Sequence, residues 1–71
     1  MQTALNEQIV TILPDGRMDT KNAAIYAGLA EKTMAMMRGR GVGPAYVKMG
    51  RIFYFKNEID DWINGRIVKT A

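Results

Sequence analysis

The sequence predicts a single, mainly α-helical domain with one small β-hairpin. Two observations lead to this fold class. Apolar residues recur at helical spacing through most of the chain, whereas they alternate with their neighbours only from Val47 to Phe55. The chain has 71 residues, which suffices for one domain with a thin core and modest stability. We therefore expect one folded unit over residues 1–71.

The first expected element is an amphipathic helix over about residues 3–12, within an N-terminal unit of residues 1–13. Its apolar face consists of four residues: Leu5, Ile9, Ile12 and Leu13. The helix is expected to stop at Pro14. Residues 14–16 form a turn motif, because Pro presets the backbone and Gly16 accepts a positive φ.

Two short helices are expected within residues 19–41. Thr20 is placed to cap the first helix, which contains the small residues Ala23 and Ala24 and ends at Gly28. These alanines would allow another helix to approach closely. The close succession of the two helices is typical of a helix-turn-helix.

The second of these helices is expected from about Glu31 to Arg38. Met34 and Met37 fall at core spacing on it, and the glycine-rich segment 39–43 must end it. The segment follows a helix and precedes a strand. A phosphate-binding loop has the reverse order, so a turn is favoured here.

The hairpin is expected over residues 45–56, with Gly50 at its turn, and a final helix over residues 57–65. Asn57 is placed to cap this helix, and Trp62 lies on its apolar face. Residues 66–71 are expected to form a loose tail.

The charge of the chain is polarised. No acidic residue lies between Glu31 and Glu58. That stretch carries six bases: Lys32, Arg38, Arg40, Lys48, Arg51 and Lys56. The other four bases and all seven acids sum to −3, which gives +3 for the whole chain. Clustered cations of this kind favour a polyanionic partner through counterion release, and double-stranded DNA is the first to consider.

The composition excludes several other functions. The chain has no Cys and no His, so a disulfide framework, thiol catalysis and the usual zinc or haem ligands are not expected. The acids are scattered, and the adjacent Asp60 and Asp61 read as the start of a helix rather than a catalytic pair. We expect no enzyme activity, cofactor, metal or small-molecule ligand. With no membrane span or signal peptide in the sequence, we expect a cytoplasmic protein.

The ordered set of residues from 18 to 63 resembles a known family. The shared positions are Met18 and Thr20, Ala23 and Ala24, Thr33, Gly41, Gly50 and Arg51, and finally Tyr54, Asn57, Glu58, Ile59 and Trp62. Together they resemble the excisionase and AlpA-type winged helix-turn-helix DNA-binding domain, which is related to the DNA-binding domain of MerR regulators. The resemblance implies a winged helix-turn-helix fold, here with an additional N-terminal helix.

The resemblance also implies a function. It points to a sequence-specific DNA-binding protein of a phage or mobile element, either an excisionase-like recombination factor or a small transcription regulator, acting at the nucleoid or in a phage-infected cell. Two alternatives stay open. One is the DNA-recognition domain of a phage packaging protein, and the other is a protein-interaction module that keeps the same fold.

Three departures from the family pattern involve four residues. Ala30 stands where Ser or Thr usually precedes the recognition helix, which removes a side-chain cap worth about 1 kcal/mol. Ala27 replaces a larger aliphatic residue. Phe53 and Phe55 occupy outward strand positions, so they either contact a protein partner or are covered by the N-terminal helix.

Eight residues are the expected DNA contacts: Lys21, Lys32, Thr33, Met36, Arg38, Arg40, Lys48 and Arg51. Those on the second helix or just beyond it can reach base edges and phosphates in the major groove, with phosphate contacts the more numerous. Met36 either meets a thymine methyl or is a flexible surface residue. Lys48 and Arg51 place charge along the hairpin, and Lys21 lies at a helix start near phosphate. A domain this small is also expected to self-associate or to bind DNA cooperatively.

Overall fold

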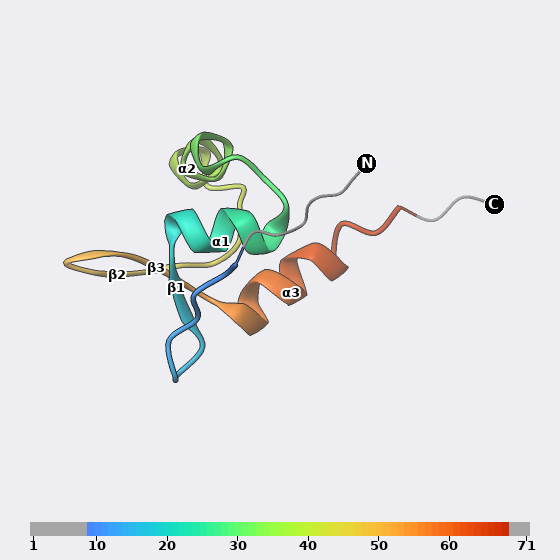
Figure 1. Cartoon of the computed structure of the whole chain (residues 1–71). Coiled ribbons are helices and arrows are strands. Elements are labelled where there is room, and N and C mark those ends of the chain that lie inside the picture. The colour runs from blue at the N-terminus through green and yellow to red at the C-terminus, as the bar shows by residue number, and fades with distance from the viewer. Residues whose placement is uncertain (1–8, 69–71) are drawn as a thin grey trace.

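The computed structural model describes residues 9–68 as three helices and a three-stranded antiparallel sheet (Figure 1). In chain order the elements are β1 (Arg17–Asp19), α1 (Thr20–Ala27), α2 (Glu31–Arg40), β2 (Val47–Met49), β3 (Arg51–Phe55) and α3 (Lys56–Asn64). The order of strands in the sheet is β1-β3-β2. The fold is thus a mixed α and β arrangement, with more sheet than the sequence predicts.

The expected N-terminal helix is wrong for its described part. Residues 9–13 contain no helical turn, while residues 1–8 lie outside the described residues. The backbone N–H of Thr11 donates to Oδ1 of Asn22 at 2.9 Å, and that of Leu13 donates to the carbonyl of Arg17 at 2.8 Å. The segment therefore gives these two donors to the rest of the domain rather than to carbonyls four residues back. The turn before β1 is confirmed, with Gly16 at φ 93°.

Strand β1 is absent from the sequence-based expectation. It pairs with β3, placing Arg17 opposite Phe55, Met18 opposite Tyr54 and Asp19 opposite Phe53. Three residues are too few to show an alternating pattern in the sequence. The β2–β3 hairpin itself is confirmed, with Gly50 at φ 74° between the strands.

Helix α1 is capped by Asp19 and not by Thr20, which is instead the first residue of the helix. The Asp19 side chain accepts a hydrogen bond from the backbone N–H of Asn22. A carboxylate at this position also gains from the positive end of the helix dipole. The helix ends at Gly28 in the left-handed conformation, as expected.

The ends of α2 and α3 differ from expectation by small amounts. Helix α2 continues through Arg40 before Gly41 ends it in the left-handed conformation, and Ala30 supplies no side-chain cap. Helix α3 begins at Lys56 with Phe55 as its N-cap residue, so Asn57 lies within the helix and does not cap it.

The core lies where α1, α2, α3 and the sheet meet. Its fully buried residues are Met18, Ala23, Ala24, Met34, Tyr54 and Ile59. The two alanines allow α2 to approach α1 closely, and Met34 fills the space between them. This packing fixes α2 beside α1 after a connection of three residues, 28–30. In the described part of the chain, no helix has the length and apolar character needed to cross a membrane.

Candidate nucleic-acid interface

Helix α2 has one exposed, partly basic side. Lys32, Met36 and Arg40 are spaced four residues apart and are all exposed. Met34, on the opposite side, has no exposed surface. Residues at this spacing follow one face of a helix. The buried methionine therefore holds α2 on the domain while the Lys32, Met36 and Arg40 face remains accessible. Thr33 is half-buried at the edge of this face.

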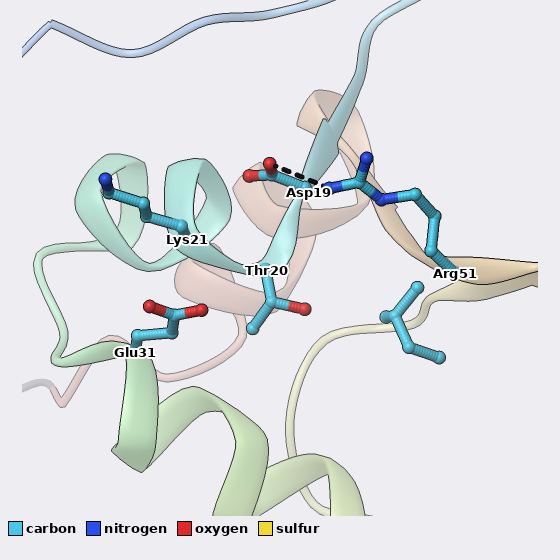
Figure 2. A pocket seen from close by; sticks show the side chains of 6 residues that line it. Asp19, Thr20, Lys21, Glu31 and Arg51 are labelled. Carbon is cyan, nitrogen blue, oxygen red and sulfur yellow. Dashed lines mark hydrogen bonds and ion pairs between the residues drawn. The ribbon is translucent and has the colours of Figure 1, made fainter.

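A cavity of about 240 Å³ lies where the start of α1, the start of α2 and the hairpin come together (Figure 2). Six residues line it: Asp19, Thr20, Lys21, Glu31, Arg51 and Ile52. Two of the predicted contacts, Lys21 and Arg51, are thus brought to one site. The same site holds two acids, so its local charge is mixed rather than purely basic.

Arg51, at the start of β3, is held by two neighbours. Its Nη2 lies 3.3 Å from Oδ2 of Asp19, and its guanidinium lies 5.5 Å from the centre of the Phe53 ring. The backbone N–H of Asn22 lowers the pKa of Asp19 most, and the nearby charges of Arg51 and Lys21 lower it further. The Arg51 side chain is still 66% exposed, so it remains reachable.

Arg38 extends toward the interior of the domain. Its Nη1 donates to Oγ1 of Thr20 at 3.2 Å and to the hydroxyl of Tyr54 at 3.1 Å. The guanidinium also lies 5.9 Å from the centre of the Tyr46 ring. Arg38 therefore joins α2 to α1 and β3. The sequence places it among the DNA contacts, and that role stays a prediction.

Lys56, which also belongs to the stretch without acids, forms an ion pair. Its Nζ lies 3.1 Å from Oδ2 of Asp60, one helical turn away, and Asp60 also accepts a hydrogen bond from the Tyr26 hydroxyl. The Tyr26 hydroxyl and then Lys56 lower the pKa of Asp60, while hydrogen bonding to Asp60 raises the pKa of Lys56. Ion pairs thus offset part of the +6 charge counted along the sequence, since Lys56 pairs within α3 and Arg51 pairs with the distant Asp19.

Besides the half-buried Arg38, four of the predicted contacts lack a carboxylate partner among the described residues. Within residues 9–68 they form no ion pair: Lys21, Lys32, Arg40 and Lys48. All four are exposed, and they come from α1, α2 and β2. These side chains are the cations that a phosphate can neutralise without first displacing a carboxylate.

Phe53 and Phe55 are half-buried, and strand β1 provides cover. The Arg17 guanidinium lies 4.8 Å from the centre of the Phe53 ring, and Asp15 holds that guanidinium through a 2.6 Å contact. Part of the cover is therefore intramolecular. Residues 17–19 supply part of it, and Thr11 and Leu13 line a cavity together with Phe53. The expected cover by residues 1–8 lies outside the described residues. Contact of these aromatics with a protein partner stays a prediction.

Two acids at this candidate site were not among the residues expected there. Asp19 is 32 residues from Arg51 in the chain, and no local pattern signals that they meet. Glu31 was treated as the edge of the acid-free stretch, although it lines the same cavity as Lys21. Of these two acids, only Asp19 forms an ion pair within the described residues.

No protein-family model matches this chain, and a comparison with curated proteins also returns no match.

Proposed function

We propose that this chain is a winged helix-turn-helix protein that binds double-stranded DNA. Helix α2 lies in the major groove, and the β2–β3 hairpin lies on the adjacent backbone or minor groove. The observation that carries the proposal is the exposed face of α2, on which Lys32, Met36 and Arg40 lie opposite the buried Met34. A helix anchored in this way can present side chains to base edges.

The hairpin and α1 support the same mode of binding. Lys48 on β2 and Lys21 on α1 are exposed, and Lys21 lines the cavity that separates α1 and α2 from the hairpin. Cations on both sides of a recognition helix can contact phosphates flanking the groove. Such contacts fix the position of a protein on the duplex without reading its sequence.

The resemblance to excisionase and AlpA-type domains suggests the biological role. We infer a small phage or mobile-element factor that directs recombination or regulates transcription. The DNA-recognition domain of a packaging protein is the second form of the same activity. Footprinting on DNA that flanks the native gene would separate these roles by showing where the protein binds.

The test of DNA binding is a salt titration followed by fluorescence anisotropy on a labelled duplex. The four exposed cations without an ion pair should give a slope of log affinity against log salt of about −3.6, since each neutralised phosphate contributes about −0.9, and a phosphate contact by Arg51 would steepen it to about −4.5. The Lys32→Ala/Arg40→Ala double variant should flatten that slope by about two units. A slope near zero, or no binding at low salt, would overturn the proposal.

A protein-docking role for the hairpin is the alternative from a different class. One observation favours it: a cavity of about 200 Å³ beside the hairpin has Tyr46, Val47 and Phe55 among its lining residues. Under this alternative, Phe55→Ser should abolish self-association in sedimentation experiments and leave the anisotropy titration unchanged. Loss of DNA affinity without any change in sedimentation would reject it.

A further inference from the structure

We propose that Asp19 is a positioning residue for Arg51, holding the hairpin arginine in one orientation for contact with the duplex. This inference rests on the proposed DNA-binding function. Strand β1 carries Asp19 directly opposite Phe53 in the sheet register. Arg51 lies two residues before Phe53 on β3, so the sheet itself brings the carboxylate and the guanidinium together (Figure 2).

The carboxylate of Asp19 is fixed from one side. Its Oδ1 accepts hydrogen bonds from both the backbone N–H and the side-chain Nδ2 of Asn22, each at 2.9 Å. Asn22 is in turn bound through its Oδ1 by the backbone N–H of Thr11. With Oδ1 used in this way, Oδ2 is directed at a set position, where it meets Nη2 of Arg51 at 3.3 Å.

The guanidinium of Arg51 is restrained on a second side by Phe53. The ring centre lies 5.5 Å from the guanidinium carbon, a distance at which a cation and an aromatic face attract each other. Nε and Nη1 of Arg51 bond to none of the described residues. The arginine is therefore oriented while two of its nitrogens remain available for a phosphate or a base edge.

An oriented arginine binds at a lower entropic cost than a free one. Arginine is among the side chains that lose most rotamer freedom on being fixed, and restraint in the unbound state reduces that loss on binding. Removing the restraint should weaken contact at the preferred DNA site by about 3- to 10-fold. Asp19 also carries a negative charge, whose removal alone would strengthen binding to any duplex.

Loss of the restraint should lower affinity for the duplex, whereas loss of the negative charge should raise it. Comparing Asp19→Asn with a variant that only removes a charge therefore separates the two effects. Asp19→Asn keeps an oxygen that can cap α1, because Asn is as good an N-cap as Asp, but it removes the ion pair with Arg51. The matched control is Asp15→Asn. Asp15 pairs with Arg17 at 2.6 Å, so this variant makes the same charge change at a neighbouring ion pair without freeing Arg51.

The experiment uses the full chain and two labelled duplexes, one bearing a site selected from a random library and one of scrambled sequence. We expect Asp19→Asn to lower affinity for the selected site about 3- to 10-fold and to reduce its preference over the scrambled duplex. Asp15→Asn should leave affinity for the selected site unchanged or slightly raised. Thermal melts of both variants check that the domain remains folded.

A double-mutant cycle with Arg51→Ala tests whether Asp19 acts through Arg51. Asp19→Asn should have no further effect on site preference once Arg51 is absent. Nitrogen relaxation of the Arg51 Nε–H group in the free protein gives a readout without DNA, and its order parameter should fall in Asp19→Asn.

Two results would overturn the inference while leaving the proposed function in place. One is a gain in affinity for the selected site in Asp19→Asn equal to that in Asp15→Asn. The other is an undiminished effect of Asp19→Asn in the Arg51→Ala background. Absence of duplex binding by the wild-type chain would instead overturn the proposed function and this inference with it.

Discussion

Replacing Arg38 tests whether this arginine serves the fold or the DNA. Tyr54 is fully buried, and its hydroxyl accepts a hydrogen bond from Nη1 of Arg38. In the described part of the chain, every buried side-chain nitrogen and oxygen has a partner. Arg38→Ala would remove both the Tyr54 bond and the bond to Thr20, leaving a buried hydroxyl unpaired.

The expected loss of stability is large for a domain of this size. A hydrogen bond from a charged donor contributes about 1.5–3 kcal/mol, and a buried polar group left without a partner costs about 1–3 kcal/mol. Because these terms overlap, we expect Arg38→Ala to lower the free energy of unfolding by about 2–4 kcal/mol. A chain of 71 residues has only about 4–11 kcal/mol in total. The melting temperature should fall by about 10–25 °C.

The assay is thermal and urea unfolding followed by circular dichroism, on Arg38→Ala, Tyr54→Phe and the double variant. Tyr54→Phe removes the hydroxyl that Arg38 binds. The double variant should therefore be less destabilised than the sum of the two single variants, by at least about 1 kcal/mol. At a temperature where Arg38→Ala is folded, its salt slope for duplex binding should match that of the wild type.

One pair of results would refute this reasoning. If Arg38→Ala melts within about 3 °C of the wild type, the bonds to Thr20 and Tyr54 contribute little. If its salt slope is also flatter by about one unit, Arg38 neutralises a phosphate, as the sequence alone suggests.

Three further predictions concern single positions. Glu31→Gln should raise duplex affinity about 2- to 4-fold at low salt by removing a negative charge near phosphate, and the gain should be lost at high salt. The control is Glu58→Gln, which removes a charge from the first turn of α3 and should have less effect in the same anisotropy titration. The Tyr26 hydroxyl lowers the pKa of Asp60. The ionised Asp60 carboxylate therefore stabilises the fold above its unfolded-state pKa, and this contribution is lost as pH falls through its folded-state pKa. In thermal melts between about pH 5 and pH 2, the melting temperature of Asp60→Asn should decline less steeply than that of the wild type. Gly50 has φ 74° and open space around it, so Gly50→Ala should cost about 1 kcal/mol in urea unfolding through backbone strain alone.

Features that depend on local backbone preference were predictable from the sequence. Gly16, Gly28 and Gly50 mark chain reversals in the sequence, and all three adopt the positive φ that glycine tolerates best. The alternation from Val47 to Phe55 correctly predicted the hairpin, because side chains in a strand point to opposite faces in turn. Helical spacing likewise placed Met34 in the core.

Local preference also produced two errors at helix starts. Thr20 and Asn57 are residue types that commonly cap helices, yet Asp19 caps α1 and Phe55 precedes α3. In both cases a strand runs directly into the helix, so pairing in the sheet decides where the extended backbone ends. The expected N-terminal helix is also wrong over its described residues, 9–13, because that segment bonds to a distant part of the chain. Its apolar spacing fits a helix, but Thr11 bonds to Asn22 instead.

The arrangement of charges at the candidate interface was not predictable from the sequence. The sequence shows a stretch of six cations without an acid, but β1 brings Asp19 to Arg51 across 32 residues. Arg38 and Lys48 look alike in that stretch, yet one bonds to Thr20 and Tyr54 while the other is exposed. Spacing along a chain reports which face of an element a residue occupies. The partner that the face meets depends on contacts between distant segments, which exist only once the sheet and the helices have packed together.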